Sequence, residues 1–291
     1  MANITAALVK ELRERTQAGM MDCKKALMEN DGDMDKAIDW LREKGLAQAA
    51  KKAGRIAAEG AVVQYITECG KVGAVVEVNC ETDFVAKTDN FMNFANSVAK
   101  HVALANPADI EALNAQKFVD DETKTIEDLI SEATVAIGEK ISVRRFARYE
   151  TTGLVSSYIH MGGKVGVLLQ VETGKAETAA AEAFQTMCKD ITLHIAACAP
   201  KSVDSSSLDP AFVAEEQEIA KAQLIAEGKP EHLLEKILPG KLKALYKQSC
   251  LMSQEFVKDP SISVEKLVAN IGKELGDTVT VVSFERFQLG A

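Results

Sequence analysis

The chain has 291 residues, with 34 lysine and arginine residues against 43 aspartate and glutamate residues, and a formal net charge of −9. This acidic balance argues against broad binding to nucleic acid or to anionic membranes, because both need a positively charged surface. No segment approaches the roughly 18 consecutive apolar residues of a membrane span, and the N-terminus, Met1–Lys10, lacks the apolar core of a signal peptide. We therefore expect a cytoplasmic protein.

The sequence carries no recognisable catalytic or metal-binding motif. None of its 6 cysteines is arranged as C-x-x-C, and it has only 4 histidines. It also lacks a phosphate-binding loop, a G-x-S-x-G element and a zinc-protease motif. We predict no metal, no cofactor and no enzymatic activity of its own, and expect reduced cysteines with mainly structural roles.

Residues 1–45 have the apolar spacing of three short helices. The predicted helices are Ile4–Thr16, Asp22–Asn30 and Asp35–Lys44. We expect Asp22 to be an N-cap, and Gly19 and Gly45 to interrupt helical structure. The Ala-rich, basic residues 46–59 are expected to form a helical or mobile connector. Up to Arg55 the chain has 11 basic and 9 acidic residues, so this part carries +2 and the remainder −11.

An internal repeat occupies most of the remaining chain. Residues 60–107 align with 153–200 without a gap, and 14 of 48 positions are identical, where unrelated sequences would share roughly 3. Residues 120–149 align with 258–287 in the same way, but the offset rises from 93 to 138. The second copy therefore carries an insertion of 45 residues between Pro200 and Lys258.

Both copies predict the same elements. Two β-rich runs around a Gly-containing turn form a hairpin, followed by an amphipathic helix, a shorter helix and a last strand. In the first copy these segments are Ala61–Thr67, Val72–Val78, a helix that includes Phe91–Val102, Thr125–Ile137 and Ile141–Tyr149. The fold class is therefore α+β, with two small antiparallel sheets that each have helices on one face.

The insertion predicts two helices, Ala211–Glu227 and a second helix after Gly228-Lys229-Pro230. A short turn between two helices indicates an antiparallel helical hairpin that projects from the body. Its apolar seam would favour a partner or a second copy of the chain, so we expect a homodimer through this hairpin. The alternative is a hairpin folded back on its own sheet.

Histidines occupy equivalent positions in the two copies at His101 and His194, on the apolar helix faces. A residue type repeated in this way favours a packing role over a ligand role. His160 has no counterpart, because Thr67 stands at that position in the first copy. It lies at a strand end, where it is either an exposed contact residue or an ordinary turn residue.

One loop differs between the copies although the surrounding elements repeat. Thr82, Asp83 and Phe84 align with Lys175, Ala176 and Glu177. An acidic group beside a large apolar ring in a strand-to-helix loop can act as a wedge that enters another protein. The alternative is that Asp83 caps the next helix and Phe84 joins the core.

Met20 and Met21, after Gly19 in the first inter-helix loop, are a second candidate contact surface, because methionine suits adaptable interfaces. The alternative is that they fill the core of the small helical bundle.

The sequence resembles the bacterial elongation factor Ts family along its whole length. The resemblance is carried by LVKELRERTQAGMMDCKKAL at 8–27, AAKKAGRIAAEG at 49–60, EVNCETDFVAK at 77–87 and SYIHMGGKVGVLL at 157–169. It implies a helical domain like the ubiquitin-associated (UBA) domain, with its linker, at 1–54. It also implies core subdomains at 55–150 and 151–291, the second carrying a coiled-coil insertion at about 205–252.

The resemblance also implies a function and a set of contact residues. The family exchanges guanine nucleotides on elongation factor Tu: it binds Tu carrying GDP, perturbs the Mg²⁺ site and accelerates GDP release during translation elongation. Thr82, Asp83, Phe84 and Val85 match the segment that displaces Mg²⁺, and Arg13, Met20, Met21 and His160 would contact Tu. The alternative function is a non-catalytic adaptor or chaperone-like binding module.

Overall fold

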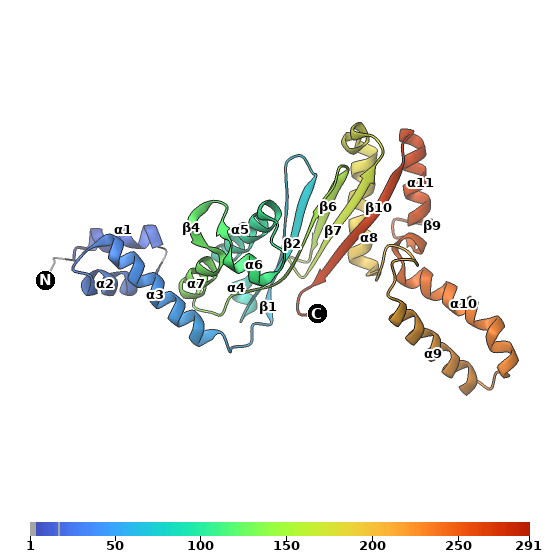
Figure 1. Ribbon diagram of the computed structural model, residues 1–291, viewed down its shortest axis with the longest axis horizontal. Coiled ribbons are helices and arrows are strands. Elements are labelled where there is room, and N and C mark those ends of the chain that lie inside the picture. The colour runs from blue at the N-terminus through green and yellow to red at the C-terminus, as the bar shows by residue number, and fades with distance from the viewer. Residues whose placement is uncertain (1–3, 17) are drawn as a thin grey trace.

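The computed structural model describes residues 4–16 and 18–291, which form a mixed α+β structure. Figure 1 shows an elongated arrangement in which the N-terminal helices lie at one end and a helical hairpin at the other. The N-terminal helices are α1 (Ala6–Thr16), α2 (Met20–Glu29) and α3 (Met34–Lys52). They enclose a small core centred on Leu12, Cys23 and Leu27, all completely buried.

Two details of these helices differ from the sequence prediction. Helix α2 begins at Met20, so Gly19 occupies the N-cap position, and Asp22 instead accepts a hydrogen bond from Lys44 at 2.5 Å. Helix α3 does not end at Gly45 but continues to Lys52. The Ala-rich residues that follow favour helix, and Gly45 is buried against α7, which outweighs the roughly 1 kcal/mol cost of an internal glycine.

The two repeat units follow one another along the chain. The first unit consists of β1 (Glu59–Ile66), β2 (Val72–Cys80), α4 (Asp83–Ala86), α5 (Asp89–Ala105), α6 (Ile110–Ala115), β3 (Lys117–Phe118), β4 (Asp121–Thr125), α7 (Ile126–Ile137) and β5 (Ser142–Glu150). The second unit begins with β6 (Leu154–His160), β7 (Val165–Thr173), the 3₁₀-helix η1 (Ala176–Ala180) and α8 (Glu182–Cys198). After the insertion and the 3₁₀-helix η2 (Leu251–Ser253), it ends with β8 (Glu255–Phe256), β9 (Asp259–Ser263), α11 (Val264–Leu275) and β10 (Val279–Gln288).

The predicted alignment of the repeats is confirmed at the level of elements. Helices α5 and α8 have the same length at an offset of 93, and α7 and α11 match at an offset of 138. The short helix α6 and the small β3–β4 and β8–β9 hairpins were not predicted from the sequence.

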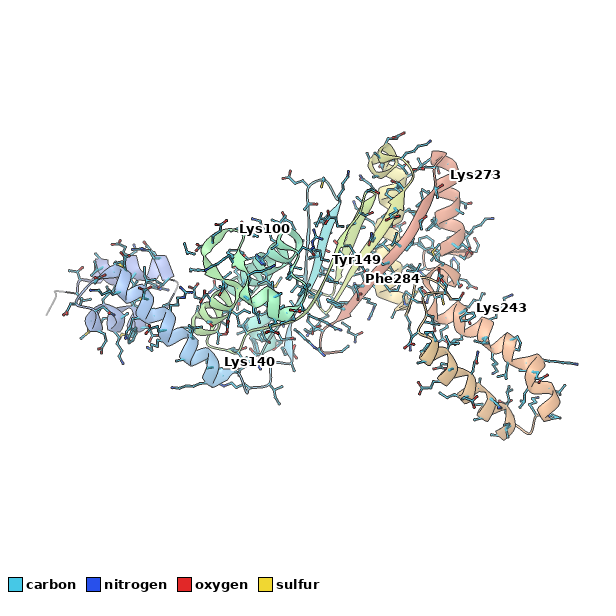
Figure 2. All side chains as sticks on the ribbon, viewed as in Figure 1. Lys100, Lys140, Tyr149, Lys243, Lys273 and Phe284 are labelled. Atoms are coloured by element: carbon cyan, nitrogen blue, oxygen red, sulfur yellow. The ribbon has the colours of Figure 1, made fainter. Side chains whose placement is uncertain are left out.

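The central strands form two antiparallel sheets, in the orders β1–β2–β5 and β10–β7–β6. One face of each sheet packs against the helices of its own unit, and the opposite faces pack against each other through a separate apolar cluster. Its buried members are Val62, Val75, Val155, Leu168 and Phe287. Figure 1 shows the resulting order of helices, sheet, sheet and helices, and Figure 2 labels Tyr149 between the sheets.

Equivalent glycines allow the two sheets to approach closely. A Cβ atom on Gly73 would lie 2.7 Å from a methyl carbon of Val155, and one on Gly166 would lie 2.3 Å from a methyl carbon of Val62. Backbone hydrogen bonds are reciprocal as well, from Val62 N to Gly163 O at 2.8 Å and from Val155 N to Gly70 O at 2.7 Å. The two units are therefore related by approximate twofold symmetry.

The insertion forms the antiparallel helices α9 (Pro210–Ala226) and α10 (Glu231–Ser249). Figure 1 shows this hairpin pointing away from the sheets, so the alternative of a hairpin folded back on its own sheet is wrong. Within the described residues, no helix has the length and apolar character needed to cross a membrane.

Candidate functional site

The loop that distinguishes the two repeat units, Thr82–Val85, is called the wedge segment below. It begins two residues after β2 and forms most of the single turn α4. Thr82 is the N-cap, because its hydroxyl accepts a hydrogen bond from Val85 N at 3.4 Å. Val85 packs against the first core, and Ala86 is buried in it.

The aromatic ring of the wedge segment projects into solvent. Phe84 is 80% exposed, although large apolar side chains are usually buried. Asp83 does not cap the helix; it pairs with Lys87 at 2.8 Å. The alternative expectation, a capping Asp83 and a core Phe84, is therefore wrong.

Charged side chains surround the wedge segment. The hydrogen bond from Lys87 and, more weakly, the charge of Lys164 lower the pKa of Asp83. Glu81, just before the segment, accepts from Lys140 N at 2.7 Å and from Arg55 at 3.2 Å, and these contacts lower its pKa. Both carboxylates are therefore ionised at neutral pH.

The connector from α3 meets the first unit beside the wedge segment. The ammonium group of Lys140 donates to the carbonyl oxygens of Ala53 at 2.6 Å and Arg55 at 3.0 Å. Figure 2 labels Lys140 near this junction, beside the lower end of α3. The connector is therefore anchored where it enters β1.

His160 lies at the end of β6 and is exposed. Its Nδ1 atom is 3.0 Å from the hydroxyl oxygen of Tyr158. The turn that follows lies against β1, where Lys164 pairs with Glu59 at 3.0 Å. The charge of Lys164 also lowers the pKa of Asp83, so the His160 turn lies in the same region as the wedge segment.

The three N-terminal candidates are exposed but lie elsewhere. Arg13 is on the outer face of α1, and Met20 and Met21 form the first turn of α2 rather than a loop. Met21 is 75% exposed, so the alternative of core filling is wrong for this side chain. Figure 1 places α1 and α2 at one end of the molecule and α4 near its middle.

Further residues of this surface were not predicted from the sequence. Ile56 and Met161 are 86% and 71% exposed, in the connector and in the His160 turn. Met161 is the first residue after β6 and has a positive φ of 51°, so it does not continue the extended backbone of the strand. Glu139, which binds the wedge segment, was also missed.

The wedge segment carries an exposed apolar ring beside a surface ion pair. Cavities of about 370 and 420 Å³ flank the contact between the N-terminal helices and α7, and neither is lined by the wedge segment. Among residues 4–16 and 18–291, no cluster of three or more His, Cys, Asp or Glu side chains is arranged to hold a metal ion. An exposed aromatic ring on a surface turn suits insertion into another protein.

Comparisons with known proteins agree on one family. A family model described as "Elongation factor TS" matches residues 81–291. The chain is 46% identical over 288 residues to elongation factor Ts of Trichlorobacter lovleyi, covering 99% of this chain and 93% of that protein. It is 48% identical to elongation factor Ts of Clostridium perfringens with the same coverage. It is 44% identical to that of Halothermothrix orenii, covering 97% of this chain and 91% of the relative.

Proposed function

The chain belongs to the elongation factor Ts family, whose role is in translation elongation, and from this premise we propose that it exchanges guanine nucleotides on elongation factor Tu. In this proposal it binds Tu carrying GDP, perturbs the Mg²⁺ site of Tu and accelerates GDP release. It forms no covalent bond with a substrate and needs no cofactor of its own.

The exposed ring of Phe84 is the observation that carries this proposal. We assign the wedge segment, Thr82–Val85, to the displacement of Mg²⁺. Phe84 enters an apolar pocket of Tu, Asp83 anchors beside it, and Thr82 and Val85 hold the turn in place. Arg13, Met20, Met21 and His160 are assigned to further contacts with Tu, and their exposure is consistent with that role.

The mechanism follows from linkage between binding sites. Nucleotide and Mg²⁺ stabilise each other in a GTPase. A protein that binds best to the Tu state with a distorted Mg²⁺ site weakens nucleotide binding by the same factor by which nucleotide weakens that protein. GDP then leaves quickly, and GTP displaces the exchange factor.

The test compares GDP release in two variants. Phe84→Ala removes the ring, and Glu177→Ala changes the exposed residue at the equivalent position of the second unit. We expect Phe84→Ala to slow catalysed release of fluorescent GDP from Tu at least about tenfold, the effect of losing one buried aromatic contact. With Glu177→Ala, GDP should leave Tu at the rate seen with the wild-type protein. Circular dichroism should show that both variants are folded. A wild-type rate for folded Phe84→Ala would exclude the wedge assignment.

The same stopped-flow experiment separates the alternative function. An adaptor or chaperone-like module would bind Tu through the N-terminal helices or the hairpin without changing the rate of GDP release. Exchange requires that the wild-type protein accelerates release. Tight binding without acceleration would favour the adaptor.

We also propose that α9 and α10 mediate a homodimer. The two helices enclose a groove of about 190 Å³ lined partly by Ile219, Leu238 and Leu242. Ile219 and Ile225 are exposed, so apolar surface is left for a second copy. Residues 210–246 can be replaced by a short Gly-Ser linker, which keeps Ser249 as acceptor for Lys201 N. The mass measured by light scattering, divided by the mass of one chain, should then fall from two to one. An unchanged ratio would exclude a dimer through this hairpin.

A further inference from the structure

The direction of the Phe84 ring is not fixed by core packing. The ring is 80% exposed, whereas Val85 and Ala86 contact the core. The backbone on the N-terminal side of the turn, at Glu81 and Thr82, therefore contributes to the direction of the ring together with the buried residues that follow it.

Glu139 holds this backbone through three hydrogen bonds. Its Oε2 atom accepts from Glu81 N and Thr82 N, each at 3.0 Å, and its Oε1 atom accepts from Thr82 Oγ1 at 2.7 Å. A hydroxyl has one proton, so Thr82 donates it to Glu139 and keeps a lone pair for Val85 N. The carboxylate thus also orients the N-cap of α4.

The contact between the two segments is reciprocal. Lys140 N, next to Glu139, donates to Glu81 Oε1 at 2.7 Å. Glu139 is placed by the end of α7, where Gly138 adopts a left-handed conformation with φ 89°. The wedge segment is therefore attached to the end of a packed helix.

The second unit contains the same device without the ring. Asp277, at the position equivalent to Glu139, follows the left-handed Gly276 and accepts from Lys175 N at 2.9 Å and Thr178 Oγ1 at 2.6 Å. Lys175 and Thr178 are equivalent to Thr82 and Val85. The loop held by Asp277 presents Glu177 where the first unit presents Phe84, so only the first clamp holds an apolar wedge.

Building on the exchange function proposed above, we propose that Glu139 is a positioning residue that holds Phe84 in the direction needed to enter the partner GTPase. Glu139 itself does not touch the partner in this scheme. It acts through the two backbone amides and the Thr82 hydroxyl. Asp277 supplies a matched control, because it makes comparable bonds to a loop that lacks the ring.

The first test measures the segment in the free protein. Glu139→Gln places an amide donor among groups that need an acceptor, and Asp277→Asn does the same in the second unit. Hydrogen exchange of a peptide covering residues 81–87 should be about tenfold faster in Glu139→Gln, the effect of losing one hydrogen bond to a charged group. It should be unchanged in Asp277→Asn. Unchanged exchange in Glu139→Gln would overturn the proposal without reference to Tu.

The second test measures release of fluorescent GDP from Tu in a double-mutant cycle. Glu139→Gln should lower the maximal release rate about tenfold, whereas Asp277→Asn should not. In a Phe84→Ala background, Glu139→Gln should have no further effect, because there is no ring left to position. Additive losses would mean that Glu139 supports the fold in general, and would overturn the proposal.

Two further outcomes are distinguished by the same set of proteins. If Glu139→Gln does not fold, Glu139→Asp keeps the charge but withdraws it by one methylene, and it should show a smaller loss with the same dependence on Phe84. The proposal would be overturned if folded Glu139→Asp accelerated GDP release at the wild-type rate and its hydrogen exchange in residues 81–87 were also unchanged. A wild-type protein that does not accelerate GDP release would instead contradict the exchange function, and with it any positioning role in exchange.

Discussion

His101 and His194 are completely buried, and each is held by the same groups in its own unit. Backbone N–H groups of Val119 and Val257 donate to the Nδ1 atoms at 3.3 and 3.2 Å. The Nδ1 atoms are therefore unprotonated, and the Nε2 atoms donate to Gln116 and Gln254 at 3.0 and 2.8 Å. These partners confirm the expected packing role and fix both rings in one neutral tautomer.

This arrangement predicts a pH dependence of stability. Burial lowers the pKa of both histidines from the ordinary value of 6.5. Below that pH the unfolded chain takes up protons that the folded chain does not, so the free energy of unfolding falls as pH decreases. Each histidine contributes up to about 1.4 kcal/mol per pH unit in this window. The free energy of unfolding is measured with urea at several values between about pH 7.5 and 5.5. Its change per pH unit should be smaller in His101→Gln than in wild type, and smallest in the variant that also contains His194→Gln. Equal slopes in all three proteins would contradict the prediction.

At the scale of single residues, the repeat in the sequence predicted some roles and concealed others. Phe84 could be identified because its counterpart is Glu177, a residue of different chemistry. Glu139 could not, because its counterpart is Asp277 and the two do not count as an identity. Its partners Glu81 and Thr82 are also nearly sixty residues away, and no local pattern indicates which carboxylate will reach them.

At the scale of elements, the contact between the two sheets depends on the absence of side chains at two equivalent strand positions, Gly73 and Gly166. Gly73→Ala would bring Cβ to 2.7 Å from Val155 Cγ1, and Gly166→Ala to 2.3 Å from Val62 Cγ1. These valines are stiff and buried, so the sheets must separate. Each variant should lose about 1–3 kcal/mol of unfolding free energy.

The matched control for this prediction is Gly54→Ala. No atom lies within 4 Å of the Cβ position of Gly54, and its φ is not positive. Its unfolding free energy should stay within about 0.5 kcal/mol of wild type. Chemical denaturation measures all three variants, and similar values for all of them would mean that the sheets accommodate the extra methyl groups.

The three long strands and the two main helices of each unit were predicted because two copies of the sequence could be compared. The N-terminal helices have no second copy, and there the glycine at position 45 was wrongly taken as an end. The small hairpin β3–β4 was missed because β3 has only two residues, too few to show alternation. The stacking of the sheets was also not predicted. The sequence of β2 does carry a signal for it, because its apolar residues are nearly continuous, and the strand is buried along almost its whole length, as is typical of a strand covered on both faces.

At the scale of the whole molecule, an ion pair contributes to the contact that holds α3 of the N-terminal helices against α7 of the first unit. Arg42 on α3 donates two hydrogen bonds to Asp128 on α7, at 3.0 and 2.5 Å. Asp128 also completes the capping box of α7 with Thr125. Burial alone would raise the pKa of Asp128, but the bonds from Arg42 and Thr125 lower it. The division of the chain at residues 1–54, 55–150 and 151–291 stays a prediction.

The Arg42–Asp128 pair therefore helps to hold the N-terminal candidates at a fixed distance from Phe84. Arg42→Ala should free the N-terminal helices while leaving the α7 cap intact, because Thr125 still binds Asp128. In small-angle X-ray scattering, we expect Arg42→Ala to have a larger maximum dimension than wild type. Protease should cleave residues 53–58 about tenfold faster, because the contact between α3 and α7 loses about 1.4 kcal/mol. Lys36→Ala is the control, because it removes an ion pair to Asp33 within the N-terminal helices themselves. If Arg42→Ala matches Lys36→Ala in both measurements, other contacts between α3 and α7 hold the N-terminal helices in place.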